Sequence, residues 1–281
     1  MSLVYTDFCK SMGRQLVLID IIIKYYNIKV KKNILVYAKF GRNHCNPTFD
    51  DFMKIYYTGE SRLTSSGAHY IIGSLPTKNN YIQVNNYERI EKTNRGLDFK
   101  LYETLNSQWK LVPKTKFCCF IVSRGCDKSV RTKFFNLLSQ YKKVDSLGKY
   151  KNNCDILQVQ NVGHTNDSYY KVISQYKFII CFENTSVPHY LTEKIYNAYK
   201  SNTIPIYWGD PHVTEIFNEK TFINVEKNPD YEKTIDLIKL LDNNDDLYNK
   251  YFTHSPTIDS NLHDKRLDNS ILQIRDLLNN D

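Results

Sequence analysis

An acidic and a basic residue stand side by side where an apolar run is followed by a helical pattern. Glu193 and Lys194 come after the strand-like run KFIICFE (177–183) and open a helical segment near 192–200. Ligands of open α/β sheets bind beyond the carboxyl ends of strands, and helix N-termini favour anions. A lysine in the first turn opposes the helix dipole, a cost that a phosphate bound there would offset. The pattern indicates an anion site; the alternative is a solvated Glu–Lys pair.

A second basic residue stands at the start of another helical segment. Arg131 lies early in the helical pattern 129–141, which follows the apolar run KFCCFIVS (116–123). An arginine can hold a phosphate with two parallel hydrogen bonds, whereas a lysine acts as a point charge. Arg131 and Lys194 could together neutralise a diphosphate without a metal. The alternative is that Arg131, which has other cations near it in the sequence, is an ordinary surface residue.

A carboxylate follows a strand-like run in the first part of the chain. Glu60 comes directly after KIYYTG (54–59). A carboxylate at the carboxyl end of a strand is well placed to act as a general base, and the alternative is an exposed acid in a loop. No DxD motif presents paired carboxylates to Mg²⁺, and the histidines lack the spacing of zinc ligands. We therefore expect no metal.

Short β-like runs alternate with helical segments, a pattern typical of parallel-sheet α/β domains. The predicted strands are 3–8, 34–40, 54–59, 70–74, 116–123, 177–183, 203–208 and 221–226, and the predicted helices are 14–26, 129–141, 192–200, 231–242 and 260–280. Pro113 and the lysines around it mark a joint. We expect an N-terminal domain over 1–112, a second α/β domain over 113–258 and a helical segment over 259–281.

Composition excludes several classes of protein. The chain has 281 residues, of which 41% are hydrophobic and 24% are charged, so it is not disordered as a whole. The net charge of +8 suits an anionic partner, but the basic residues are dispersed and no nucleic-acid-binding motif is present. The motifs GxGxxG and GxxxxGK[ST] are also absent. The charge alone does not choose among nucleic acid, phospholipid and a small phosphorylated ligand, and the missing motifs give no support to a nucleic-acid, dinucleotide or P-loop site.

No segment of the sequence is expected to span a membrane. The most apolar stretch, 16–26, contains Asp20 and Lys24 and is shorter than the ~20 apolar residues that a spanning helix needs. The N-terminus lacks a signal peptide pattern, and the seven cysteines form no CxxC pair, which favours a reducing compartment. We expect a cytoplasmic protein.

The run FENTSVPHYLTEKIYNAYKSNTIPIYWGDP (182–211) resembles the donor-binding signature of the α-1,3-fucosyltransferases of glycosyltransferase family 10, above all the bacterial members. Three other stretches fit this family in order: YYTGE (56–60) resembles the segment ending in its catalytic glutamate, CFIVS (119–123) its phosphate-binding strand, and VDSLGKYKNN (144–153) its Asp-Ser-Gly-Gly motif. The resemblance is thin before Tyr56. The departures are Leu147 for the first glycine of that last motif, Arg124-Gly125 where the family often has Asn-Pro, and Val187-Pro188-His189 where bacterial relatives are richer in glycine.

The resemblance implies the GT-B fold, in which two Rossmann-like domains face each other across a cleft. It implies that GDP-β-L-fucose is the donor, that the anomeric centre is inverted, and that no metal or other cofactor takes part. Glu60 would be the catalytic base, and Glu193 would act in catalysis or in donor binding. The expected donor-binding residues are Ser123, Arg131, Asn184, Tyr190, Glu193 and Lys194.

We therefore expect a metal-independent, inverting fucosyltransferase with a glycan acceptor. The expected product is a fucose on O3 of GlcNAc in an N-acetyllactosamine-type glycan. The alternatives are an α-1,4 linkage, another acceptor, or a non-catalytic sugar-nucleotide-binding protein. Such a binding protein would be expected to lose Glu60, Arg131 or Lys194, and all three are present.

Overall fold

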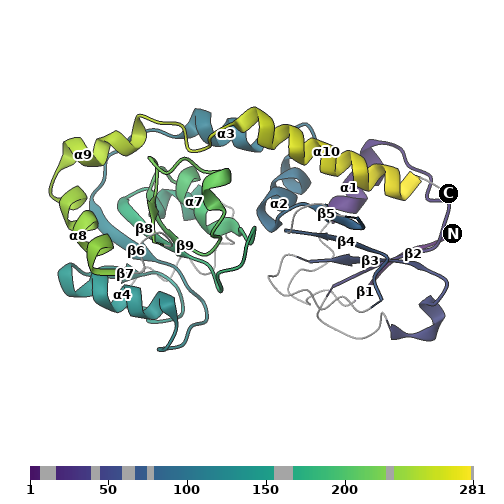
Figure 1. Cartoon of the computed structure of the whole chain (residues 1–281), viewed down its shortest axis with the longest axis horizontal. Helices are drawn as coiled ribbons and strands as arrows, with labels where there is room; N and C mark the ends of the chain where they lie inside the picture. The colour runs from purple at the N-terminus through teal and green to yellow at the C-terminus, as the bar shows by residue number, and fades with distance from the viewer. Residues whose placement is uncertain are drawn as a thin grey trace. The chain divides into compact units, whose positions relative to one another are not determined.

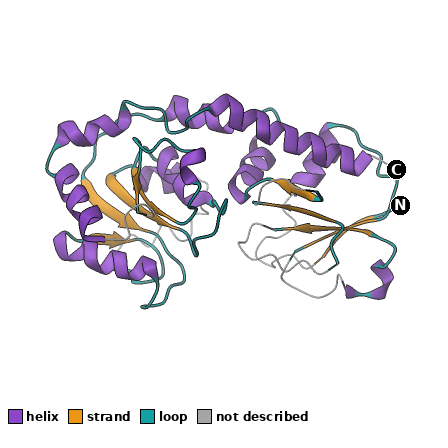
Figure 2. Cartoon of the chain, viewed as in Figure 1, coloured by secondary structure: helices purple, strands orange, loops and turns teal. Residues whose placement is uncertain are grey.

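The computed structural model describes residues 1–6, 17–38, 45–58, 67–74, 79–154, 167–225 and 231–279. Two compact units share these residues, and both are discontinuous in sequence. Unit 1 comprises Met1–Glu103, Val187–Thr192 and Ser260–Asp281, and unit 2 comprises Thr104–Ser186 and Glu193–Asp259. In each unit, helices pack against a sheet (Figures 1 and 2).

Unit 1 is built on a parallel five-stranded sheet with the order β1-β2-β3-β4-β5. Its strands are β1 (Leu3–Thr6), β2 (Ile34–Tyr37), β3 (Met53–Tyr57), β4 (Tyr70–Gly73) and β5 (Tyr81–Gln83). Its helical elements are α1 (Leu18–Tyr25), the 3-10 turn η3 (Pro47–Phe49), α2 (Asn86–Arg95) and α10 (Ser260–Asn279). Helix α3 (Leu101–Gln108) contains the boundary with unit 2.

The core of unit 1 is closed by the last helix of the chain. Figure 1 shows α10, in yellow, beside α1. Four apolar residues of α10, at the three- and four-residue spacing of one helix face, are buried in this core: Leu267, Ile271, Ile274 and Leu278. Asp268 also accepts a hydrogen bond of 2.8 Å from the buried Lys92 of α2. The C-terminal helix is thus an integral part of unit 1.

Unit 2 contains a second parallel five-stranded sheet, with the order β10-β9-β8-β6-β7. Its strands are β6 (Lys116–Phe120), β7 (Val144–Ser146), β8 (Tyr176–Phe182), β9 (Ile204–Trp208) and β10 (Ile223–Asn224). Its helical elements are α4 (Val130–Tyr141), α6 (Asp167–Ile173), α7 (Glu193–Lys200), η4 (Val213–Glu215), α8 (Tyr231–Asp242), α9 (Asp245–Asn249) and η5 (Lys250–Phe252). Because all five strands are parallel, their carboxyl ends meet at one edge.

The crossover connections place the helices of unit 2 on both faces of the sheet. The chain moves from β6 to β7 in one direction and from β7 through β8 to β9 in the other. Right-handed crossovers therefore put α4 on one face and α6 and α7 on the opposite face. Helix α4 packs against α8, and α6 packs against α7, as this arrangement requires. Strands covered on both faces must be apolar throughout, and β8 is buried along nearly its whole length.

The predicted alternation of strands and helices over two parallel-sheet units is confirmed. The longer predicted elements are present, with β2, β6, β8, β9, α4, α8 and α10 inside or within one residue of their predicted ranges. The prediction missed β5, β7, α2, α3, α6 and α9. The predicted boundaries at residues 112 and 258 differ from those of the observed units. Helix α10 belongs to unit 1, and so does the segment Val187–Thr192, although the residues on either side of that segment belong to unit 2.

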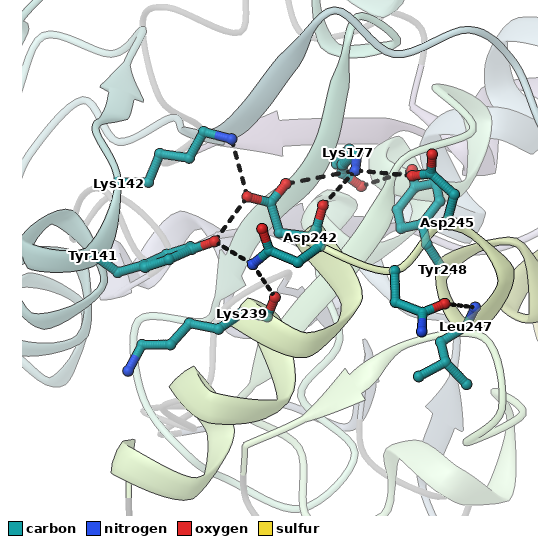
Figure 3. Close-up of polar contacts among 10 residues, drawn as sticks. Tyr141, Lys142, Lys177, Lys239, Asp242, Asp245, Leu247 and Tyr248 are labelled. Carbon is teal, nitrogen blue, oxygen red and sulfur yellow. Dashed lines mark hydrogen bonds and ion pairs between the residues drawn. The ribbon is translucent and has the colours of Figure 1, made fainter.

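A buried aspartate at the end of α8 fastens this helix to the rest of unit 2. The side chain of Asp242 is 4% exposed and lies 2.9 Å from Lys142 Nζ and 3.5 Å from Lys177 Nζ. The Tyr141 hydroxyl donates a hydrogen bond of 3.1 Å to the same carboxylate, and Lys177 also donates to the Asp242 main-chain carbonyl (Figure 3). One carboxylate thus joins the end of α4, the start of β8 and the end of α8.

We predict that Asp242→Asn lowers the free energy of unfolding by roughly 2 to 4 kcal/mol, since it leaves two lysines beside a buried neutral group. Asp236→Asn is the matched control, because Asp236 and Lys239 form an exposed pair on the same helix. The control substitution should lower the free energy of unfolding by less than about 1 kcal/mol. Urea denaturation of both variants measures the difference, and equal stability of the two would contradict this role of Asp242.

Candidate active site

Glu193 and Lys194 lie at the carboxyl edge of the unit 2 sheet. Helix α7 begins at Glu193, so Lys194 is in its first turn. Lys194 Nζ lies 2.9 Å from Glu183 Oε2 and 3.7 Å from Glu193 Oε1. Glu183 follows the last residue of β8, and its side chain is fully buried, whereas that of Lys194 is 20% exposed. Lys194 therefore contacts Glu193, its neighbour in sequence, but lies closer to a second carboxylate, that of Glu183.

Arg131 reaches the same edge from the neighbouring strand connection. It is the second residue of α4, whose N-cap Ser129 accepts a hydrogen bond from the Thr132 backbone. The Arg131 guanidinium donates a hydrogen bond of 3.0 Å to Asn184 Oδ1. Asn184 is the residue after Glu183, so consecutive residues beyond β8 contact the two cations. Arg131 thus contacts Asn184, and Lys194 contacts Glu183, the residue before Asn184.

The VDSLGKYKNN segment forms the turn beside this edge. Leu147 is fully buried and donates its N–H to the Phe120 carbonyl, so the core accommodates the leucine that replaces a family glycine. A Cβ on Gly148 would lie 2.2 to 2.7 Å from the backbone N, C and O atoms of Val122. Glycine is therefore required at position 148 by the close approach of two backbones. This contact fixes the turn against the residues that follow β6.

Tyr150 holds the loop that leads into α4. Its hydroxyl lies 3.1 Å from the Thr132 hydroxyl and donates a hydrogen bond of 2.9 Å to Asp127. This hydrogen bond, followed by the charge of Lys151, lowers the pKa of Asp127. A Cβ on Gly125 would lie 2.5 Å from the Tyr150 ring. The Arg124-Gly125 departure from the family pattern thus leaves room for the ring that holds this loop.

The other predicted site residues are distributed less compactly. Ser123 is an exposed residue in the bend after β6, and Glu193 is the partly buried first residue of α7. Tyr190 is buried, but it belongs to Val187–Thr192, which groups with unit 1. Glu60 lies outside the residues that the structure describes. Of these four residues, only Glu193 has a described contact with Lys194, and the roles of all the predicted site residues stay predictions.

Sequence reasoning missed Glu183 as a site residue. The sequence pattern places Glu183 at the end of the strand-like run KFIICFE and inside the run that resembles the donor-binding signature, but gives it no role of its own. The available signal was an acid directly after an apolar parallel strand with a lysine eleven residues further on. Periodicity cannot show that the two meet, because that depends on the length of the β8–α7 connection.

The surroundings of this edge are apolar. Burial raises the pKa of the Cys181 thiol, which lies in β8 two residues before Glu183. Burial, and then the charge of Glu193, raise the pKa of the Tyr169 hydroxyl. Both groups therefore stay neutral near pH 7, and the charges at this edge come from Arg131, Lys194 and the carboxylates beside them.

The geometry provides two cations and an amide for an anionic ligand. Among the described residues, no group of three or more His, Cys, Asp or Glu side chains is arranged to hold a metal ion.

None of the helices in the described part of the chain is long and apolar enough to cross a membrane.

A family comparison identifies this arrangement. Residues 111–273, which is more than half of the chain, match the model of the C-terminal part of glycosyltransferase family 10 (fucosyltransferase). The chain belongs to this family. The match covers most of unit 2, including Arg131, Asn184, Glu183 and Lys194, and excludes the first 110 residues.

Relatives of this family member are named for different kinds of fucosyl transfer. A fucosyltransferase of Acanthamoeba polyphaga mimivirus is 37% identical over 150 residues, 52% of this chain and 25% of that protein. The alpha-(1,3)-fucosyltransferase FucT of Helicobacter pylori is 38% identical over 135 residues, 48% of this chain and 26% of that protein. Human GDP-fucose protein O-fucosyltransferase 3 is 34% identical over 134 residues, 46% and 28% of the two chains. The chain thus matches about a quarter of the length of these relatives.

Solved structures extend the likeness in fold over nearly all of this chain. A crystal structure of an α1,3-fucosyltransferase with GDP-fucose has a TM-score of 0.70 and 24% identity, and covers 97% of this chain and 89% of the other. A second α1,3-fucosyltransferase structure has a TM-score of 0.72 and 22% identity, with 98% and 89% covered. The predicted GT-B fold class, with two parallel-sheet α/β units, is confirmed.

We predict that Gly148→Ala lowers the free energy of unfolding by roughly 1 to 3 kcal/mol, because its Cβ would overlap the Val122 backbone. Lys149→Ala, at the exposed neighbouring position, is the control and should change stability by less than about 0.5 kcal/mol. Thermal or urea denaturation measures both. A Gly148→Ala chain as stable as the control would show that the turn can move away from β6.

Proposed function

We propose that this family 10 chain transfers L-fucose from GDP-β-L-fucose to a sugar hydroxyl with inversion at the anomeric carbon. The observation that carries the proposal is the contact of Arg131 and Lys194 with consecutive residues beyond β8, within the part of the chain that matches the family. Two cations at the carboxyl edge of a parallel sheet suit a nucleoside diphosphate.

In the proposed reaction, the acceptor oxygen forms a bond to C1 of fucose while the bond from C1 to the β-phosphate oxygen breaks. The bonding pair leaves with GDP, and Glu60 takes the proton of the acceptor hydroxyl. Arg131 and Lys194 stabilise the negative charge that develops on the diphosphate, so we propose that no metal is needed. Ser123, Asn184, Tyr190 and Glu193 complete the proposed donor site.

The proposed acceptor is O3 of GlcNAc in an N-acetyllactosamine-type glycan. The H. pylori relative, named as an α-(1,3)-fucosyltransferase, supports this choice. The protein O-fucosyltransferase relatives, at similar identity, favour a second candidate, a hydroxyl on a protein. An α-1,4 linkage is a third alternative. The family match lies mainly in unit 2, so it supports the proposed donor more strongly than any acceptor.

An acceptor screen tests the proposed function. The chain is incubated with GDP-fucose and either N-acetyllactosamine glycans or folded protein acceptors, and the linkage of the product is determined by NMR. The expected product carries fucose on O3 of GlcNAc, and turnover is expected to persist in EDTA. Activity that disappears in EDTA and returns with Mn²⁺ would refute the metal-free mechanism. GDP-fucose binding without transfer to any acceptor would favour the non-catalytic alternative.

We predict that Arg131→Ala and Lys194→Met each weaken GDP binding by roughly 1.5 to 3 kcal/mol, because each removes a charge-assisted contact with the diphosphate. Methionine keeps the aliphatic part of the lysine side chain packed. Lys133→Ala is the control, since it removes an exposed cation from the same helix as Arg131. Calorimetric titration with GDP measures all three. Wild-type affinity in both site variants would place the diphosphate elsewhere.

We predict that Glu60→Gln slows fucosyl transfer by about 10²- to 10⁴-fold, because the amide keeps the size of the side chain but cannot accept the acceptor proton. GDP-fucose affinity, measured on the same preparation, should stay near that of the wild type. A variant that transfers fucose at nearly the wild-type rate would rule out Glu60 as the base. Glu193→Gln would then be the next variant to measure.

A further inference from the structure

Glu183 is a buried charge at the proposed donor site with no role in the reaction described so far. Its side chain is fully buried, and Lys194 Nζ lies 2.9 Å from Oε2. A carboxylate removed from water is costly unless a nearby cation and hydrogen bonds compensate it. The Glu183–Lys194 pair supplies this compensation, so the position of one charge depends on that of the other.

The Glu183 side chain is held in place from the side of β9. Its backbone N–H donates a hydrogen bond of 2.8 Å to the Trp208 carbonyl. A Cβ on Gly209 would lie 2.5 Å from Glu183 Cγ and 2.6 Å from its Cβ. The side chain therefore packs directly on the bare backbone at position 209. The same Cβ would lie 3.0 Å from the Tyr207 hydroxyl, which accepts a hydrogen bond of 2.9 Å from the Asp210 backbone.

Lys194, by contrast, has a long side chain that is partly exposed. A lysine side chain loses conformational entropy when it is fixed in one rotamer. A rigid carboxylate 2.9 Å away confines the ammonium group before a ligand arrives. An ammonium has three N–H donors, so it can bond to Glu183 and to a phosphate oxygen at the same time.

We infer that Glu183 is a positioning residue, which acts through Lys194 to hold its ammonium group where the diphosphate of a nucleotide sugar binds. This role rests on the proposed function. Glu183 does not contact the reacting atoms in this role. Its effect is to preorganise the cation, so that less ordering remains to be done when the donor binds.

A double-mutant cycle on GDP affinity tests the inference. Glu183→Gln should weaken GDP binding about tenfold in the wild-type chain, the loss expected for one displaced charge-assisted contact. In the Lys194→Met chain the same substitution should change GDP binding less than about twofold, because the residue through which Glu183 acts is absent. Equal fold-changes in both chains would overturn the inference. A wild-type chain that does not bind GDP would instead refute the proposed function itself.

Comparing the GDP affinities of two variants at position 183 distinguishes a role of the carboxylate charge from a role of side-chain packing. Glu183→Gln keeps the size and removes the charge, whereas Glu183→Asp keeps the charge and leaves a gap. The inferred role predicts weaker GDP binding for Gln than for Asp, and a packing role predicts the reverse order. Gly209→Ala displaces the carboxylate without changing any charge, so it should also weaken GDP binding. It is the test variant to use if Glu183→Gln does not fold. Wild-type GDP affinity in a folded Gly209→Ala chain would overturn the inference.

Discussion

The buried carboxylate of Glu183 constrains the carboxyl edge of the unit 2 sheet. A charge out of water needs a partner, and here the partner comes from the next helix, so α7 must begin within reach of the end of β8. Glycine at position 209 follows from the same requirement, because any Cβ there would overlap the carboxylate side chain. The lysine in the first turn of α7, unfavourable for the helix dipole, is explained by a carboxylate that the helix itself does not contain.

The order of strands determines which residues meet at this edge. Strands β6 and β8 are neighbours, so the connections that follow them emerge side by side. Arg131 follows β6, and Glu183 and Asn184 follow β8, although about fifty positions of sequence separate the two segments. A parallel sheet thus brings together charges that no local pattern relates. The family match covers this half of the chain, and the names of the matching relatives share fucosyl transfer, with an α-(1,3) linkage in one name and a protein acceptor in another.

The sequence was sufficient for the elements with long apolar runs and for the residues with a strong local pattern. KFIICFE, IPIYW and the helix after Ser129 were all predictable, because burial on both faces or a capping residue marks them. Strand β7 has three residues, too few for periodicity. Helix α2 has a local signal in the sequence, since Asn85 and Glu88 form a capping box. Glu183 could not be paired with Lys194 from sequence, because their distance depends on how a loop returns to the sheet.

The place of α10 has a consequence for how the chain is made. Synthesis proceeds from the N-terminus, and domains fold as units as they emerge from the ribosome. Every residue of unit 2 has been synthesised by position 259, whereas the core of unit 1 still lacks the apolar face of α10. Unit 1 is therefore completed after unit 2, although its strands come earlier in the sequence. In that interval its core exposes apolar surface of the kind that chaperones bind.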